Sequence, residues 1–192
     1  MDMKSTIKAL ISDSIETKQK MLDEGQLVYI QSIANKINEA YQHGKKTIIF
    51  GNGGSACDAL HFAAELVCRF EKNRKALPAI ALTENISSVT AIGNDFGYDF
   101  IFSRQVEAFA QKGDIIIAIT TSGNSINVIK AVETAKKMGI FVIGLTGADG
   151  GQLKLLSDMC YCAPSKVTGR IQECHILLLH IIAKLVEEKI FG

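Results

Sequence analysis

Two residues one helical turn apart, His61 and Glu65, are the pair in this sequence best suited to chemistry. They lie in the stretch FGNGGSACDALHFAAELVCRF, residues 50–70. In a helix, positions i and i+4 share a face, so the imidazole and the carboxylate would lie side by side. Such a pair can supply two metal ligands, or a general base beside a polarising group. A solvated surface pair is the alternative that the spacing leaves open.

A second set of such residues lies near the C-terminus, in TGRIQECHILLLHIIAKL, residues 168–185. Gln172 and His180 share a helical ridge at i and i+8, whereas Glu173 and His180 align slightly better at i and i+7. Spacing alone therefore does not decide which side chain is the neighbour of His180. A histidine among leucines and isoleucines is typical of a buried core residue, and a ligand or a base is the alternative.

The stretch GNGGSA, residues 51–56, follows an apolar run and opens a helical pattern. Its glycines allow positive φ angles and the close approach of a ligand, and the amides at a helix start are unpaired. It lacks the lysine of a Walker loop, and its spacing does not fit GxGxxG. Anion binding and an ordinary strand–helix turn are both consistent with it.

The stretch TTSGNS, residues 120–125, is rich in hydroxyl groups just before a helical pattern that begins near Ile126. Its four hydroxyls belong to Thr120, Thr121, Ser122 and Ser125. A helix cap needs one of them, and hydroxyls with amides at the positive end of a helix bind phosphate. We therefore predict a phosphate site here. The later stretch TGADGG, residues 146–151, is expected to form a turn with Asp149 as a cap.

Asn94 and Asp95 lie in GNDFGYD, residues 93–99, which is expected to be a loop between helical segments. Both residue types form turns readily, and both could also hydrogen-bond a polyol.

The elements that must position these residues are short apolar runs alternating with helical patterns. The expected strands are 46–50, 77–83, 114–120, 140–146 and 159–163, and the expected helices between them are 55–70, 99–111, 126–138 and 168–189. Runs that are apolar on both faces are typical of parallel strands covered by helices, which predicts an α/β layered domain with right-handed crossovers. Ligands then bind beyond the carboxyl ends of the strands. Gly113 and Gly139 are expected at helix ends.

Two further helical segments, roughly 3–22 and 26–43, precede the first strand and are separated by Gly25. They have no strand of their own, so they are expected to pack on the sheet or on another subunit.

Composition narrows the class of protein. The chain has 192 residues, 47% of them hydrophobic, and a net charge of +1, so we expect one domain and no nucleic-acid partner. No signal peptide or membrane-spanning run is recognisable, which predicts a cytoplasmic protein without a membrane partner. The five cysteines include no CxxC pair and are expected to be small buried residues. A metal or redox role for the alternating Cys160 and Cys162 is the alternative.

Four stretches together resemble the sugar isomerase (SIS) domain family and, within it, the phosphoheptose isomerases. They are GNGGSACDALHFAAELVCRF, TAIGNDFGYDFIFSRQV, TTSGNS and RIQECHILLLH, in that order, and the resemblance covers nearly the whole chain. It implies a three-layer αβα sandwich around a five-stranded parallel sheet. The whole chain, 1–192, would be one SIS domain, with N-terminal helices in 1–45 at the interface of a homotetramer and the sheet and C-terminal helix in 46–192. The active sites would lie between subunits.

The implied reaction interconverts D-sedoheptulose 7-phosphate and D-glycero-D-manno-heptose 7-phosphate. This aldose–ketose isomerisation proceeds through an enediol and is the first step toward the ADP- and GDP-heptose precursors of bacterial lipopolysaccharide and capsule. The resemblance also implies one zinc ion per subunit, with ligands that fall on His61, Glu65, Gln172 and His180. Glu65 and His180 match the proposed base and acid.

Substrate contacts carried over by motif come mostly from the loops. They are Asn52, Gly53, Gly54, Ser55, Glu65, Asn94, Asp95, Thr120, Thr121, Ser122, Ser125 and Gln172. One departure is visible: many relatives carry an aspartate before RIQE, where this chain has Gly169. Any contact made by that carboxylate would be missing here.

Two other functions compete with this interpretation. One is a non-catalytic SIS protein, either a phosphosugar-binding regulator or a module that associates with a replication initiator. The other is an isomerase of the same fold acting on another sugar phosphate, such as arabinose 5-phosphate. The presence of both Glu65 and His180 favours an enzyme over a regulator.

Overall fold

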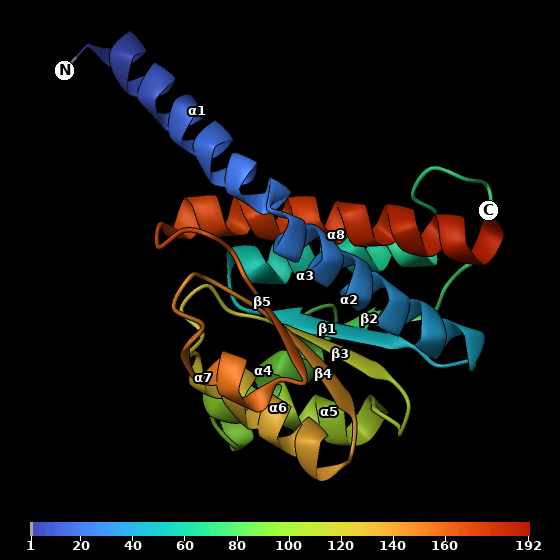
Figure 1. Cartoon of the computed structure of the whole chain (residues 1–192). Helices are drawn as coiled ribbons and strands as arrows, with labels where there is room; N and C mark the ends of the chain where they lie inside the picture. The colour runs from blue at the N-terminus through green and yellow to red at the C-terminus, as the bar shows by residue number, and fades with distance from the viewer. Residues whose placement is uncertain (1) are drawn as a thin grey trace.

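A computed structural model describes residues 2–192 of the chain (Figure 1). It has five strands and a series of helices, all within the α/β class that the sequence predicts. In chain order they are α1 Met3–Gln19, η1 Lys20–Leu22, α2 Glu24–Gln42, β1 Thr47–Gly51, α3 Gly54–Val67, β2 Ala79–Ala81, α4 Ile86–Asp95, η2 Tyr98–Phe100, α5 Ser103–Phe109, β3 Ile115–Ile119, α6 Ile126–Lys137, β4 Phe141–Thr146, α7 Gly151–Leu156, β5 Met159–Cys162 and α8 Thr168–Phe191.

The strands form one parallel sheet in the order β2-β1-β3-β4-β5. Every residue of β1 and β3 is buried, as expected for strands covered on both faces. The chain winds from β1 outward to β2 on one side and then crosses to β3 on the other. The loops that follow β1 and β3 therefore meet at a switch point, where open α/β sheets bind ligands.

Helices cover both faces of this sheet, which confirms the three-layer sandwich. One core packs α2, α3 and α8 against side chains such as Ile49, Ile117 and Ile143 (Figure 1). The other packs α5, α6 and α7 against Ile48 and Ile116 from the opposite side of the same strands. Strand alternation sends neighbouring residues to the two cores, so the apolar runs contribute to both.

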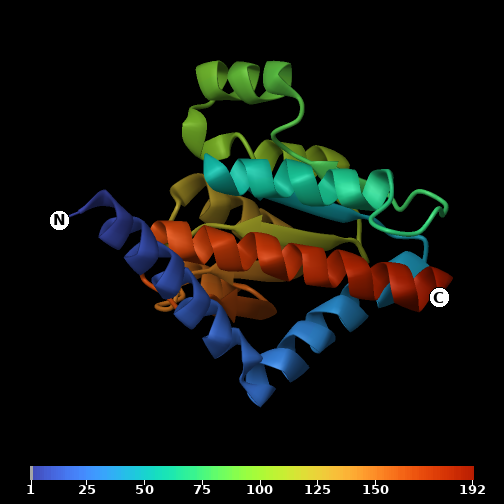
Figure 2. The same cartoon turned by 90° about the horizontal axis from the view of Figure 1, so that it is seen from above.

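Helix α1 projects away from the sheet (Figures 1 and 2). Its one buried residue is Thr17, and its large apolar side chains are exposed. The boundary with α2 differs from the prediction. Asp23 separates the helices by capping α2 through the amides of Gly25 and Gln26, so Gly25 lies inside the first turn of α2. The capping carboxylate, rather than the glycine, marks the start.

Two short helices were not predicted. Helix α4 spans Ile86–Asp95, so Asn94 and Asp95 end a helix instead of lying in a loop. Its signal was Asn85, whose side chain caps the amide of Ser88. Helix α7 follows Gly150, so the expected turn continues into a helix. Gly139 lies just beyond α6 as predicted, whereas Gly113 lies in the turn before β3, four residues after α5.

Candidate active site

Three of the predicted functional side chains meet where α3 and α8 pack side by side. His61 Nε2 lies 2.9 Å from Glu65 Oε1 and 3.3 Å from His180 Nε2. One nitrogen or oxygen of each residue lies within 4.8 Å of the other two. The His61 side chain is 47% exposed and that of Glu65 is 23% exposed, so the cluster is open to a ligand. His180 is half-buried, so it is not the fully buried core residue that a histidine among leucines and isoleucines typically is.

Helical periodicity creates this cluster. The opposite face of α3 buries Ala59, Phe62 and Leu66 on the sheet, which turns His61 and Glu65 outward. Helix α8 runs beside α3 (Figure 2) and buries its own apolar stripe, which leaves His180 half-buried on the side that faces His61. The Phe70 ring lies 5.8 Å from the His180 ring and covers one side of it.

The structure shows that Gln172 and Glu173 face different parts of the molecule, which helical spacing alone did not decide. Glu173 turns toward α1, where it accepts hydrogen bonds from Ser14 and Lys18 and pairs with Arg170. Gln172 faces the first residue of α3, at the end of the loop after β1. Its amide nitrogen lies so close to Gly54 that a Cβ on Gly54 would come within 2.4 Å of it. Gln172 is two turns from His180, about 12 Å along α8. Its role as a metal ligand stays a prediction.

A buried ion pair holds the end of α3 beside the cluster, and sequence reasoning missed it. Arg74 donates to Glu187 and to the backbone carbonyls of Glu65 and Leu66. Glu187 also accepts the amides of Phe70, Glu71 and Lys72, and both charged side chains are at most 2% exposed. We call these two residues the Arg74–Glu187 clamp. The sequence did hold a signal for this pair. Glu187 follows Ala183 by four positions, on the buried face of α8, and a buried carboxylate needs a buried partner.

Asp58 is a further ionisable group that the sequence reasoning missed. It lies three residues before His61 on α3, and its Oδ2 finds no hydrogen-bond partner among residues 2–192. Burial raises the pKa of Asp58 to about 6, although the nearby His61 acts in the opposite direction. The i, i+3 spacing to His61 was its only signal.

The loop after β1 is fixed by side-chain amides. Asn52 and Asn127 exchange two hydrogen bonds of 2.8 and 2.9 Å, and the Tyr98 hydroxyl donates to Asn52 Oδ1. We call the first two residues the Asn52–Asn127 pair. Gly53 has φ of 56° and precedes α3 without a side-chain cap. The amides of Ser55 and Ala56 donate to the carbonyls of Asn52 and Gly53, so within residues 2–192 the Gly54 amide is the one of these three left for an anion. Ser55 is buried beneath this loop.

The loop after β3 holds the predicted group of hydroxyls. Thr120 Oγ1 lies 2.8 Å from Ser125 Oγ and 3.2 Å from Ser122 Oγ. Ser125 precedes α6 but its side chain makes no capping hydrogen bond. The hydroxyls therefore form their own network. The Val128 amide donates to Asn127 Oδ1, whereas the amides of Ile126 and Asn127 find no partner among residues 2–192 and are free to bind an anion, as a phosphate site requires. Thr121 faces the next loop through its carbonyl, which accepts the amide of Gly147.

The loop after β4 supports that site instead of capping a helix. Asp149 pairs with Lys166 at the surface, and Gly150 takes the cap position of α7, which corrects the predicted cap. The amide of Leu153 donates to the carbonyl of Gly123, and the two loop backbones lie in direct contact. Gly123 has φ of 69°, and a Cβ there would lie 2.2 Å from the carbonyl oxygen of Gly150.

Replacing Gly123 by alanine should therefore destabilise both loops. A left-handed non-glycine residue costs about 1–2 kcal/mol, and the clash with backbone adds to that cost. Gly139→Ala is the matched control, since Gly139 has the same φ of 69° with nothing within 4 Å of an added Cβ. Urea unfolding of both variants measures the difference. Equal losses of unfolding free energy would show that the loop contact carries no strain.

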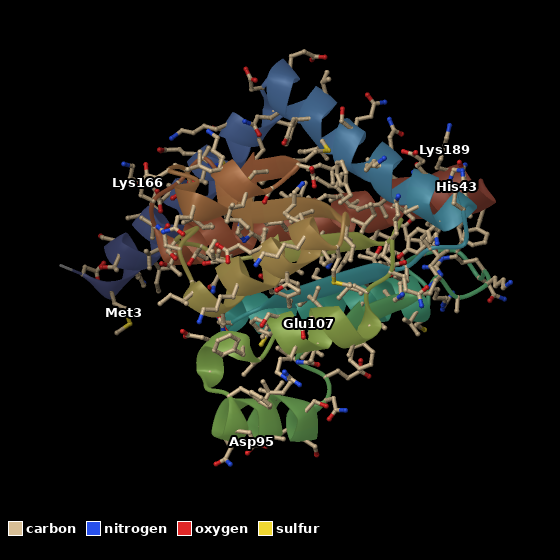
Figure 3. All side chains as sticks on the ribbon, turned by 90° about the horizontal axis from the view of Figure 1, so that it is seen from below. Met3, His43, Asp95, Glu107, Lys166 and Lys189 are labelled. Carbon is tan, nitrogen blue, oxygen red and sulfur yellow. The ribbon has the colours of Figure 1, made fainter. Side chains whose placement is uncertain are left out.

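Asn94 and Asp95 do not join the His61–Glu65–His180 cluster in this chain. None of residues 86–95 is fully buried, and α4 projects at one side of the molecule, with Val89 and Ile92 packed half-buried against the core (Figures 2 and 3). The two side chains hydrogen-bond each other and are exposed. Gly169, where relatives often carry an aspartate, lies in the first turn of α8, and a Cβ there would meet nothing within 4 Å. The fold would therefore accept the missing side chain.

Comparisons with known proteins show which family the chain belongs to. The SIS domain family model matches residues 11–147. The chain is 51% identical over 191 residues to a phosphoheptose isomerase of Clostridium acetobutylicum, covering 99% of this chain and 97% of the relative. The chain belongs to the phosphoheptose isomerase family. A second family member, from Aneurinibacillus thermoaerophilus, is 52% identical over 190 residues, covering 98% of this chain and 96% of that protein.

A solved structure extends the agreement to three dimensions. The phosphoheptose isomerase of Neisseria gonorrhoeae superimposes with a TM-score of 0.92 at 38% identity, covering 97% of this chain and all of the other. The sequence resemblance and the fold it implied are thereby confirmed. Among residues 2–192, no helix combines the length and apolarity needed to cross a membrane.

Proposed function

We propose that this chain interconverts D-sedoheptulose 7-phosphate and D-glycero-D-manno-heptose 7-phosphate. The observation that carries the proposal is the His61–Glu65–His180 cluster, which lies on α3, the helix that the loop after β1 opens, in a member of the phosphoheptose isomerase family. The reacting carbons, at one end of an extended substrate, would lie at the cluster, and the phosphate, at the other end, would lie at the loops.

Glu65 is the proposed base for the carbon proton. An aldose–ketose shift removes a proton from one carbon and returns it to the neighbouring carbon through an enediol. Glu65 Oε1 faces His61, which leaves Oε2 for the proton. This division lets one carboxylate both face a metal site and act as a base. His180, whose ring lies 4.9 Å from that of His61, would move the proton between the two substrate oxygens.

The cluster fits a zinc ion. Tetrahedral zinc with bonds of about 2.05 Å places its ligand atoms roughly 3.3 Å apart, and the two histidine nitrogens have that separation. His61, Glu65 and His180 would hold the ion, and Gln172 is the proposed fourth ligand. When bound, zinc would polarise the substrate carbonyl as a Lewis acid.

Zinc should stabilise the wild-type protein and not His61→Ala. At free zinc of 100 times the dissociation constant, one site adds about 2.7 kcal/mol to the free energy of unfolding. Thermal melts with and without zinc measure this. His43→Ala is the control, because His43 lies at the end of α2, outside the cluster (Figure 3). A zinc-dependent rise of equal size in His61→Ala would reject the site.

The substrate phosphate is proposed to bind the loops after β1 and β3. The contacts would be the backbone of Gly53 and Gly54, Ser55, and the hydroxyls of Thr120, Thr121, Ser122 and Ser125, with the free amides of α6. Asn52 shapes this site through its amide pair, and Asn94 and Asp95 are proposed to contact the sugar hydroxyls. Remote phosphate binding then orients the reacting carbons.

We also propose that the chain is a single-domain subunit of a cytoplasmic homotetramer. Met3, Ile7, Ile11 and Ile15 repeat every four residues along α1 and are all exposed, which supports an assembly role for the N-terminal helices. The exposed α4 would likewise deliver Asn94 and Asp95 to a site completed by another subunit.

Proton NMR of sedoheptulose 7-phosphate with zinc-loaded protein tests the function directly. A new anomeric signal of a heptose 7-phosphate is expected. Folded, zinc-loaded protein that leaves the ketose unchanged would rule the proposed reaction out.

A further inference from the structure

Asn127 is a buried polar residue whose side chain makes none of the proposed substrate contacts. It lies in the first turn of α6 and is 3% exposed. Its side-chain oxygen accepts the amide of Val128 at 2.9 Å, a local bond that asparagine often makes near a helix start. That bond needs the oxygen alone. The side-chain nitrogen of Asn127 donates instead to Asn52 Oδ1, 2.9 Å away in the loop after β1.

The Asn52–Asn127 pair uses its full capacity to accept hydrogen bonds. Asn52 Nδ2 donates back to Asn127 Oδ1 at 2.8 Å, and the Tyr98 hydroxyl donates to Asn52 Oδ1 at 3.0 Å. Each side-chain oxygen of the pair therefore accepts two hydrogen bonds, one for each of its lone pairs. Asn52 is thus held from two separate elements, α6 and η2, by a buried polar network whose members are satisfied.

Asn52 in turn fixes the backbone that follows it. Gly53, with φ of 56°, and Gly54 come next and have no side chains that could hold the loop. The amide of Gly54 finds no partner among residues 2–192, and the same is true of the amides of Ile126 and Asn127 at the start of α6. The Asn52–Asn127 pair is the side-chain link between these two groups of free amides, so it keeps their separation constant.

We propose that Asn127 is a positioning residue for the substrate phosphate and acts through Asn52. The inference rests on the proposed function, which places the phosphate at the loops after β1 and β3. By holding Asn52, the side chain of Asn127 keeps the Gly54 amide at a fixed distance from the α6 amides. Donors that are already in place need no ordering when the ligand binds, and the affinity rises by that saving.

This role predicts a rise in KM without a matching fall in kcat. The reacting carbons would lie at the His61–Glu65–His180 cluster, whereas the phosphate contacts are the same before and during the reaction. Asn127→Ala removes two hydrogen bonds to Asn52, each worth roughly fivefold, so KM should rise at least about tenfold. The inhibition constant of inorganic phosphate should rise by the same factor, and kcat and zinc affinity should stay near the wild-type values.

Asn38→Ala is the matched control. Asn38 is 4% exposed, so it is buried as deeply as Asn127, but it lies on α2, away from both loops. Its replacement should leave KM and the inhibition constant of phosphate unchanged. A purely structural role for Asn127 would reduce the folded fraction and the apparent kcat, and it would not change KM. Wild-type values of KM and of the inhibition constant in Asn127→Ala would therefore overturn the proposal.

Tyr98→Phe tests the same network if Asn127→Ala does not fold. Tyr98 is 60% exposed, and the replacement removes only the hydroxyl that donates to Asn52. The inhibition constant of phosphate should rise about fivefold. The effects of Tyr98→Phe and Asn127→Ala should not multiply in the double variant, because both act through Asn52. A wild-type inhibition constant in Tyr98→Phe would contradict the inference.

Calorimetric titration with inorganic phosphate separates this inference from the proposed reaction, because it needs no turnover. Wild type should bind phosphate, and Asn127→Ala should bind it at least about tenfold more weakly. If this difference appears in a wild-type protein that does not isomerise sedoheptulose 7-phosphate, the proposed reaction fails and the positioning role stands. If wild type isomerises the sugar and the two proteins bind phosphate equally well, the positioning role alone is wrong.

Discussion

Glu65→Gln is expected to lower kcat for sedoheptulose 7-phosphate by about 10²- to 10⁴-fold, the usual contribution of a general base. Glutamine keeps the size of the side chain and one oxygen toward His61, but it cannot accept the carbon proton. The zinc-loaded variant should therefore bind the sugar phosphate with little change in affinity. Proton NMR in deuterium oxide measures both turnover and the appearance of solvent deuterium on carbon.

Glu107→Gln is the matched control for this prediction. Glu107 is exposed on α5, in the helical layer on the other side of the sheet (Figure 3). The Glu107→Gln variant should isomerise the sugar phosphate, and introduce solvent deuterium on carbon, at the wild-type rate. If saturating zinc restored full turnover to Glu65→Gln, the carboxylate would serve only to hold the metal, and the base would have to be another group.

Breaking the Arg74–Glu187 clamp is expected to cost about 3–5 kcal/mol of unfolding free energy, because removing one partner leaves a buried charge unpaired. Arg74→Met would leave the Glu187 carboxylate buried without its cationic partner. Glu187→Leu would leave both Arg74 and three backbone amides without their acceptor. The double replacement should recover part of the loss, since no buried charge remains. Urea unfolding of the three variants measures the coupling.

The control for the clamp is an exposed ion pair on the same helix. Lys184 pairs with Glu71 and Glu188 at the surface, where solvent weakens ion pairs, so Lys184→Met should cost far less unfolding free energy than either single clamp variant. Arg74→Met should also lower kcat, because Arg74 holds the backbone carbonyl of Glu65. A clamp variant as stable as Lys184→Met would show that the buried pair contributes little.

The Arg74–Glu187 clamp should also make the free energy of unfolding depend on pH in the acid range. Burial raises the pKa of Glu187, but hydrogen bonds from three amides and Arg74 outweigh it and hold the pKa at about 2. A depressed folded-state pKa stabilises the fold above the ordinary value of 4.5 and loses that contribution as the pH falls toward 2. Wild type should therefore lose more stability over this interval than the double clamp variant.

Features set by local periodicity could be read from the sequence. The i, i+4 spacing of His61 and Glu65 and the helical ridge of His180 led to the cluster, because a helix fixes such neighbours whatever lies around it. The strands were recognisable because two-sided burial requires continuous apolar runs.

Features that depend on distant partners could not be read in the same way. Gln172 and Glu173 differ little in helical angle, and the choice between them depends on Ser14 and Lys18, more than 150 residues away. Arg74 and Glu187 are 113 positions apart, and no local pattern joins them. Helix α4 was missed because none of residues 86–95 is fully buried and its core-facing stripe is short: Val89 and Ile92 pack, half-buried, against the core.

The Asn52–Asn127 pair has an electrostatic consequence. It ties the start of α3, on one face of the sheet, to the start of α6, on the other. Each helix carries the equivalent of about half a positive charge at its N-terminus, so the two together direct roughly one full charge at the same point. If the proposed phosphate binds there, a chain with a net charge of only +1 would hold it without a lysine or arginine in either loop. Because these dipoles do not titrate, retention of the phosphate should persist into alkaline solution, where a lysine-based site would fail.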